Sequence, residues 1–343
     1  MNFLLTGDRG FIGTYIANQL LEDGNVVVGV DNNSKYGPQS KQWDGTKMYI
    51  GNDFDVRDED RLFQLMMENS ITHMIMGAAM IGGISYFHKL PYTLLATNEQ
   101  IMAAQYNAAI RYNEARPGWL KRVVVISSSM VYENAYEFPS FEGDEKIIPP
   151  PSSSYGFQKL ATEYFARAAY DEFGIPYTIV RPFNCVGVGE IRAKQEHDVM
   201  SGNVKLAMSH VVPDLIQKIA KGQNPLHILG DGRQVRYYTW GGDLARGIVE
   251  AAFHSAAINN DYNLSTIQAT TVLELAQNLW ERINGTAPFE YVSDAPFKYD
   301  VQMRSPSTIK ARSDFGWVAT KSLDDILDEV VPWTMQAIEN GLI

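Results

Sequence analysis

The feature that most constrains the fold of this chain is a repeated alternation of short apolar runs with helix-compatible stretches. Apolar runs lie at residues 2–6, 26–31, 47–51, 73–79, 122–129 and 177–183, and the clearest helical stretches lie at 58–70, 92–115 and 154–173. Nearly continuous apolar runs are typical of strands buried on both faces, and parallel strands need crossover helices between them. The pattern therefore predicts an α/β fold with a doubly wound parallel sheet.

The rhythm changes after residue 182, where a polar, glycine-rich stretch leads into a second region. There we expect a helix over 209–222, a strand over 225–230 and a C-terminal amphipathic helix over 322–341 that is interrupted at Pro332. We expect one domain over 1–182, to which the chain returns around 233–266. A smaller α/β region is expected from 183–232 and 267–343.

Composition narrows the class of partner. The chain has 343 residues, of which 45% are hydrophobic, enough for one large or two modest domains. A net charge of −11 argues against a nucleic-acid or anionic-membrane surface and favours a small-molecule partner. The single cysteine, Cys185, excludes an intrachain disulfide framework, and no metal site is expected. With no apolar segment long enough to span a bilayer and no charged leader, we expect a cytoplasmic protein.

A glycine-rich turn, TGDRGFIG at residues 6–13, follows the first predicted strand. Gly7 allows a tight turn, Gly10 lets the backbone approach a pyrophosphate, and Gly13 permits close packing of the helix-compatible segment that follows from Thr14. Phe11 and Ile12 of the turn are also expected to bind the cofactor. Asp31 ends the second strand, where a carboxylate binds a ribose diol and repels a 2′-phosphate. The arrangement predicts a Rossmann-type site for NAD.

Tyr155 and Lys159 stand four residues apart at the start of a predicted helix, so their side chains share one helix face. An ammonium beside a phenol lowers the pKa of the tyrosine, which would let Tyr155 exchange a proton with a substrate hydroxyl. Alone, this spacing is also typical of a solvated surface pair. The glycine turn and Asp31 favour the catalytic interpretation.

In this order, TGDRGFIG, Asp31, FDVRD, SSSMVY, YGFQK and RPFN resemble the extended short-chain dehydrogenase/reductase family, and specifically its nucleotide-sugar epimerases and dehydratases. The resemblance extends over essentially the whole chain. It implies NAD as cofactor and a nucleotide-diphosphate sugar as substrate. It also implies a homodimer that pairs through the helices at 92–115 and 154–173.

The resemblance also assigns cofactor contacts. These are Asn32 beside Asp31, Asp55 and Val56 at the adenine, Ala78 and Ala79 along the cofactor, Asn98 on the long helix, and Pro182. One departure is Gly77, which stands where the family often has a histidine.

Catalytic roles follow from the same resemblance. Ser128 would hydrogen-bond the substrate hydroxyl, Tyr155 would take its proton, and Lys159 would hold the nicotinamide ribose. Ser129 and Met130 would line the substrate site.

Position 130 bears on the type of reaction. Family dehydratases carry an Asp-Glu pair just before the Val-Tyr of this motif, decarboxylases often carry a glutamate, and the GDP-fucose synthase branch carries a cysteine. Met130 has no proton to exchange. The simplest remaining chemistry is removal and return of hydride at one carbon, which is epimerisation at C4 through a 4-keto sugar.

Other interpretations stay open. The segment SHVVPDL resembles the GDP-fucose synthase and GDP-mannose epimerase branch, in which the matching histidine is an acid in C3/C5 epimerisation. His210 would then be catalytic, or it would only pack or bind substrate, and His88 is interpreted as structural. A 4-keto reductase, a 4,6-dehydratase, a decarboxylase and a sensor that binds NAD without turnover are further alternatives.

The resemblance also implies substrate contacts. Asn184 in RPFN would hydrogen-bond the sugar or the diphosphate, and Arg236 and Arg304 would bind the diphosphate. Guanidinium suits that role because it stays charged and binds two oxygens at once.

Overall fold

The computed structural model of the chain describes residues 1–81, 89–194, 199–206, 210–296 and 300–343. Its centre is a seven-stranded, wholly parallel sheet in the order β13-β6-β5-β4-β1-β2-β3. The strands are β1 (Asn2–Thr6), β2 (Val26–Asp31), β3 (Tyr49–Asp53), β4 (His73–Met76), β5 (Arg122–Ile126), β6 (Tyr177–Pro182) and β13 (Asn260–Leu264). Because the order reverses between β1 and β4, this is the doubly wound Rossmann-type sheet predicted from the sequence.

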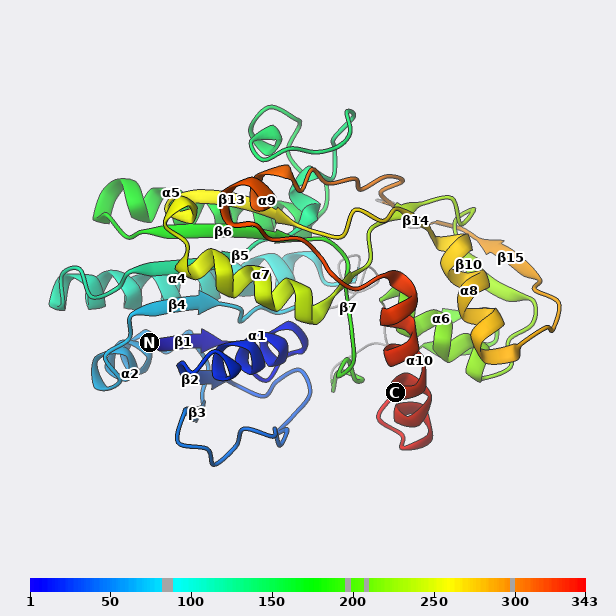
Figure 1. Cartoon of the computed structure of the whole chain (residues 1–343), viewed down its shortest axis with the longest axis horizontal. Coiled ribbons are helices and arrows are strands. Elements are labelled where there is room, and N and C mark those ends of the chain that lie inside the picture. Colours follow the sequence, from blue (N-terminus) through cyan, green and yellow to red (C-terminus); the bar gives the residue numbers. More distant parts are fainter. Residues whose placement is uncertain (82–88, 195–198, 207–209, 297–299) are drawn as a thin grey trace.

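Both faces of the sheet are covered by helices (Figure 1). The helices are α1 (Phe11–Glu22) and α7 (Gly241–Phe253) on one face, and α2 (Glu59–Glu68), α4 (Pro91–Ala115) and α5 (Ser154–Phe173) on the other. In β1, Leu4 packs into the core on the α4 side, whereas Phe3 and Leu5 pack on the α1 side, and all three are fully buried. The inner strands are largely apolar because neither face meets water, whereas the edge strand β3, with the sequence YIGND, is mostly exposed.

The C-terminal part forms a smaller α/β layer at one end of the sheet (Figure 1). Its helices α6 (Val211–Ala220), α8 (Val272–Asn284) and α10 (Leu323–Glu339) share a hydrophobic core with β10 (Leu226–Leu229), which pairs in parallel with β15 (Tyr291–Asp294). Short pairs join β7 (Cys185–Val186) to β12 (Thr239–Trp240), β11 (Val235–Arg236) to β14 (Thr270–Thr271), and β8 (Val199–Ser201) to β9 (Val204–Leu206). The remaining helices are α9 (Ile309–Phe315) and the 3₁₀ turns η1 (Ser129–Tyr132), η2 (Asp144–Lys146) and η3 (Ser255–Ala257).

The predicted interruption at Pro332 is wrong, because α10 runs through it from Leu323 to Glu339. Proline removes one N–H from the helix and frees the carbonyl four residues earlier. Pro332 lies on the exposed face of α10, where water can satisfy that carbonyl, while Val330 and Val331 keep the opposite face in the core. The stability gained by burying that face outweighs the loss of one backbone hydrogen bond at Pro332. No helix in the described parts of the chain is both long enough and apolar enough to cross a membrane.

Candidate active site

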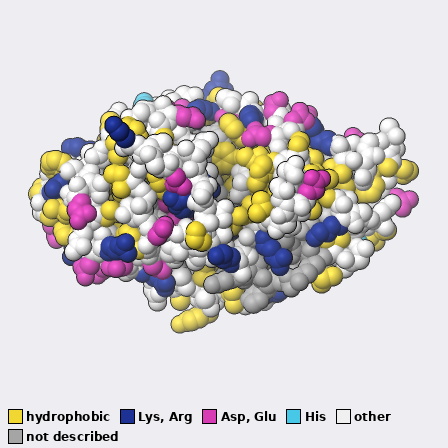
Figure 2. Space-filling view, turned by 90° about the horizontal axis from the view of Figure 1, so that it is seen from below, with side chains coloured by type: hydrophobic (Ala, Val, Ile, Leu, Met, Phe, Trp, Pro, Cys, Tyr) yellow, Lys and Arg dark blue, Asp and Glu magenta, His cyan; other side chains and the backbone are white. Residues whose placement is uncertain are grey.

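A cavity of about 940 Å³ opens at the carboxyl end of the sheet, where the C-terminal layer meets it. Figure 2 shows it as a hollow with many hydrophobic side chains between the larger and smaller parts of the molecule. Doubly wound folds bind their ligands at this edge, outside the carboxyl ends of the strands. The cavity is lined both by the glycine turn and by residues of α6, β10 and β11.

The glycine turn has the shape of an anion cradle. Gly7 adopts φ +71°, its N–H donates to the Val30 carbonyl at 2.7 Å, and a β-carbon there would come within 2.9 Å of Ala78. A β-carbon at Gly13 would collide with the Gly7 carbonyl oxygen. The first turn of α1 has no side-chain cap from the described residues, so its N–H groups are available to a phosphate.

Acidic and amide side chains extend the cradle at the ends of β2 and β3. The Asp31 carboxylate accepts the Asn33 N–H at 2.7 Å, and burial raises its pKa despite that bond. Asn32 donates to Asp55 at 3.1 Å, and the hydrogen bond from Arg57 lowers the pKa of Asp55 to about 2. Phe11, Ile12 and Val56 line the same end of the cavity.

The segment after β4 forms another wall of the cavity. The buried Asn98 side chain accepts the Met80 N–H at 2.7 Å and donates to the Met80 carbonyl at 2.9 Å, which fixes the chain next to Ala78 and Ala79. The departure at Gly77 has a packing reason, since a β-carbon there would lie 2.7 Å from the Thr6 carbonyl. Asn98 thus acts on the cavity through the backbone.

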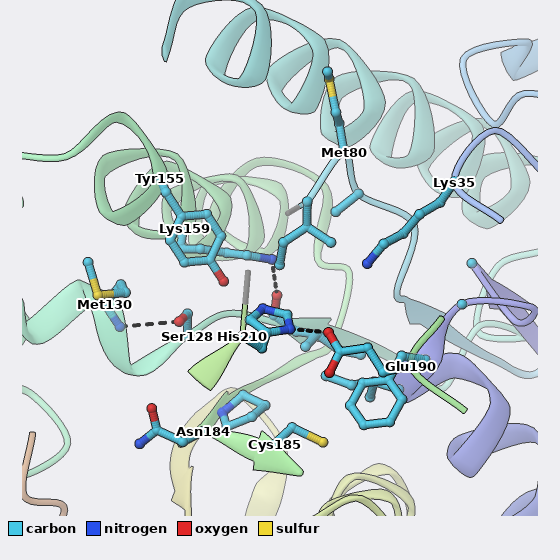
Figure 3. A pocket seen from close by; sticks show the side chains of 18 of the residues that line it. Lys35, Met80, Ser128, Met130, Tyr155, Lys159, Asn184, Cys185, Glu190 and His210 are labelled. Carbon is cyan, nitrogen blue, oxygen red and sulfur yellow. Dashed lines mark hydrogen bonds and ion pairs between the residues drawn. The ribbon is translucent and has the colours of Figure 1, made fainter. Parts of the chain in front are cut away.

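Tyr155 and Lys159 project from α5 into the cavity, and Ser128 faces them from the start of η1 (Figure 3). Lys159 Nζ donates to the Ile126 carbonyl at 2.9 Å, and burial lowers its pKa to about 8. Burial raises the pKa of Tyr155, while the hydrogen bond with Ser128 and the charge of Arg304 lower it in part. The groups that favour the phenolate here are therefore Ser128 and Arg304, whereas the sequence spacing had pointed to Lys159.

Helix α5 is held in this position at its N-terminus and at its middle. At its N-terminus Ser153 accepts the Gly156 N–H at 3.0 Å and donates to Glu133. One turn beyond Lys159, Glu163 forms a buried ion pair with Arg181 of β6 at 2.7 Å and accepts the Ser127 hydroxyl at 2.6 Å. The helix bearing Tyr155 is thereby tied to the strand end that leads into Ser128.

The predicted substrate residues that line the cavity include two cations, Arg236 and Arg304. Arg236 pairs with Asp300 at 3.3 Å, while the buried Nε of Arg304 has no hydrogen-bond partner among the described residues. Burial and the neighbouring Arg236 lower the pKa of Arg304 to about 9. Two neighbouring buried cations favour the binding of an anion here.

The other predicted site residues also line the cavity, namely Gly10, Ser129, Met130, Pro182, Asn184 and His210. Asn184 has φ +37° and donates to the Tyr237 carbonyl at 3.5 Å. His88 lies outside the described residues. Glu190 was missed from the sequence: it follows VGVG without any periodic or motif signal, yet it lies in the cavity and pairs with His210.

The sheet order, the cradle and Asp31 define a dinucleotide-binding α/β protein. Residues 3–265 match the NAD dependent epimerase/dehydratase family, and the chain belongs to that family. Its cofactor is NAD, as predicted. The uncapped start of α1 and the cradle that β-carbons at Gly7 and Gly13 would fill fit the pyrophosphate of NAD.

Individual relatives are distant but match along nearly the whole chain. UDP-glucuronate 4-epimerase of Thermodesulfobacterium geofontis (strain OPF15) is 25% identical over 346 residues, covering 98% of this chain and 97% of that protein. GDP-mannose 3,5-epimerase 1 of Oryza sativa subsp. indica is 22% identical, covering 98% and 82%. The crystal structure of UDP-glucose 4-epimerase with UDP-glucose from Thermotoga maritima is 25% identical, with a TM-score of 0.80, covering 98% and 100%.

Proposed function

We propose that this chain is an NAD-dependent nucleotide-sugar epimerase that inverts the configuration at C4 through a transient 4-keto sugar. The observation that carries the proposal is the environment of Met130, which is buried beside Ser128 and Tyr155 in the cavity. Its thioether cannot serve as a proton donor or base. The described carboxylates that line the cavity come from segments other than η1 and α5, namely Asp31, Asp55, Glu190, Asp214 and Asp300.

In this proposal Tyr155 takes the proton of the C4 hydroxyl during oxidation and returns it during reduction. The Ser128 hydroxyl holds the reacting oxygen, and Arg304 stabilises the phenolate form of Tyr155. NAD, when bound, supplies the hydride acceptor for the first half of the reaction and the hydride donor for the second. Lys159 would hold the nicotinamide ribose, and Gly7, Gly10 and Gly13 the pyrophosphate.

We place the nucleotide diphosphate at Arg236 and Arg304, with Asn184 beside it. The support is electrostatic, because the ion pair with Asp300 is made by Arg236, while Arg304 is buried beside Arg236 and its Nε has no hydrogen-bond partner among the described residues. The named relatives act on UDP- and GDP-sugars, so the nucleotide is among the points to be tested.

The test is incubation of the purified protein with UDP-, GDP-, CDP- and dTDP-sugars, read by mass spectrometry and proton NMR. The proposal expects a product of unchanged mass that is inverted at C4, without added cofactor. A product that has lost water or carbon dioxide would refute the proposal, and so would a strict requirement for added NADPH.

A second candidate, epimerisation at C3 or C5, is favoured by the Glu190–His210 pair in the cavity. Proton exchange next to a keto group would place deuterium from heavy water at C3 or C5, and His210→Asn would abolish that uptake. Epimerisation at C4 by hydride return incorporates none at carbon. Deuterium at these positions therefore separates the two candidates.

Three further points belong to the proposal. We divide the chain into a cofactor-binding part over 1–182 with 233–266, and a substrate-binding part over 183–232 and 267–343. We propose a homodimer formed through α4 and α5, because Phe157, Tyr164 and Tyr170 of α5 are exposed. A cytoplasmic location is supported by the single cysteine, which allows no intrachain disulfide.

A further inference from the structure

A carboxylate–imidazole pair lies on the cavity wall that the Rossmann sheet does not provide. His210 precedes α6, and its Nδ1 is hydrogen-bonded to the Glu190 carboxylate (Figure 3). Both residues line the cavity that also contains Ser128 and Tyr155. The His210 side chain does not cap α6, and among the described residues its hydrogen-bond partner is Glu190.

Glu190 is ionised in this setting. It is only 8% exposed, and burial alone would raise its pKa, but the charge that His210 carries when it is protonated, the hydrogen bond from His210 and the charge of Lys35 lower it. The other titratable neighbour is the thiol of Cys185, whose pKa is raised by burial and by Glu190 itself, so it remains neutral. A carboxylate this enclosed is stable only with its partners in place.

The segment that carries Glu190 is anchored rather than loosely placed. The Tyr15 hydroxyl accepts the Val188 N–H at 2.8 Å and donates to the Val188 carbonyl at 3.2 Å. Gly187 and Gly241 make room for this tyrosine, since a β-carbon at either position would collide with its ring or hydroxyl. Two residues from that clamp, Glu190 has a defined position from which to orient an imidazole.

Beyond Glu190 the same segment is held again. Arg192 N–H donates to the Leu342 carbonyl at 3.0 Å, and Lys194 N–H donates to the Lys35 carbonyl at 2.8 Å. The second bond links the segment to the loop after β2, which lines the cofactor end of the cavity. The Glu190–His210 pair is therefore supported from both the cofactor and the C-terminal sides.

We propose that Glu190 is a positioning residue that orients His210 so that Nε2 accepts a hydrogen bond from a sugar hydroxyl other than the one deprotonated by Tyr155. With Nδ1–H donated to the carboxylate, neutral imidazole presents its lone pair at Nε2. His210 then contacts the substrate and Glu190 acts through it, which makes the pair a determinant of sugar specificity. The inference rests on the proposed function, because it assumes a nucleotide sugar in this cavity.

The test compares Glu190→Gln with wild type, using UDP-glucose and UDP as probes unless the substrate panel gives a better sugar. We expect the KM for the sugar nucleotide to rise about tenfold and kcat to change less than about threefold, as for one lost charge-assisted hydrogen bond. The dissociation constant of UDP should stay unchanged. Glu290 is an exposed carboxylate outside the cavity, so Glu290→Gln is the matched control. Its KM, its kcat and its dissociation constant for UDP should equal those of wild type.

The imidazole ¹⁵N shifts of His210 supply a readout that a purely structural role would not move. They should report a proton on Nδ1 in wild type and a mixture of tautomers in Glu190→Gln. Unchanged shifts and an unchanged KM would overturn the proposal. If Glu190→Gln does not fold, His210→Ala must show the same rise in KM with unchanged UDP binding, and a wild-type KM there would also overturn it.

Failure of the proposed function gives a different result. If wild type binds UDP-glucose more tightly than UDP but leaves C4 unchanged, epimerisation is refuted, while the difference between the two dissociation constants still tests Glu190. Loss of that difference in Glu190→Gln supports the positioning role in either case. Its persistence refutes the role without affecting the assignment of the reaction.

Discussion

The sharpest prediction concerns Gly156, the residue directly after Tyr155. A β-carbon at this position would lie 2.6 Å from the Pro151 side chain and 2.8 Å from both the Glu133 carboxylate and the Met130 carbonyl oxygen. The Met130 carbonyl belongs to η1, which begins next to Ser128. Gly156→Ala therefore forces apart the two backbone segments that bring Tyr155 to Ser128.

The size of the effect follows from these distances. Ordinary contact begins near 3.4 Å, so the Met130 carbonyl must move from 2.8 Å to about 3.4 Å, a shift of about 0.6 Å. Overpacking costs about 1–3 kcal/mol, and the better helix propensity of alanine returns about 1 kcal/mol. We expect a net loss of stability of only about 0–2 kcal/mol. Activity should fall about 10- to 100-fold, because displacements near 1 Å at reacting groups cost about that much.

Gly174, at the other end of the same helix, supplies the control. It adopts φ +68°, and no described atom lies within 4 Å of the place that a β-carbon would take, so Gly174→Ala adds backbone strain of about 1–2 kcal/mol without touching the site. The assay measures kcat and the thermal midpoint of both variants. Gly174→Ala should melt lower with normal kcat, whereas Gly156→Ala, with a similar or smaller loss of stability, should lose kcat about 10- to 100-fold. If Gly156→Ala keeps wild-type kcat, α5 and η1 do not set the geometry of Tyr155 and Ser128.

Three shorter predictions follow from the site. Tyr155→Phe should lower kcat about 10²- to 10⁴-fold and leave substrate binding intact, as measured by calorimetry. Gly13→Ala should abolish retention of NAD, because the new β-carbon meets the Gly7 carbonyl; cofactor absorbance of the purified protein checks this. Burial lowers the pKa of Lys159 from 10.5 to about 8, so the unfolded chain binds this proton more tightly and Lys159 adds stability as pH rises from about 8 to 10.5. Thermal melts across that range should show the rise in wild type and a smaller one in Lys159→Met.

Much of the sheet could be predicted because its inner strands are buried on both faces and carry few polar residues, whereas the edge strands β3 and β13 are more polar. The helix over 154–173 begins and ends as expected, with Ser153 as its cap and Gly174 in the left-handed conformation after it. Short exposed pairs are harder: β15 has mostly exposed residues and no apolar run, so its pairing with β10 was not foreseen. The prediction that Pro332 interrupts α10 was wrong because Pro332 lies on the solvent-exposed face of the helix. The local sequence does not reveal that position.

The site was predictable to the extent that its residues belong to local motifs. The glycine turn and the Tyr155–Lys159 spacing are such signals, since a turn or a helix face brings the groups together. Glu190 and His210 are 20 residues apart in an irregular part of the chain, and only tertiary packing places them in contact. The source of the tyrosine pKa shift was equally hidden, because Arg304 reaches Tyr155 from a segment almost 150 residues away.

Two glycines of this chain reduce the stability of the helices that contain them but allow the close contacts that form the site. Gly13 and Gly156 both lie inside helices, where glycine is less stable than alanine by about 1 kcal/mol. In each case a β-carbon would collide with backbone, that of the glycine turn or that of η1. One glycine brings α1 close to the turn where we propose that the pyrophosphate binds, and the other brings Tyr155 close to Ser128. The same reasoning applies to Gly187 and Gly241, which both pack against Tyr15. Tyr15 holds the segment that bears Glu190 through its hydrogen bonds to Val188. These two glycines therefore belong to the site rather than to the surrounding loops.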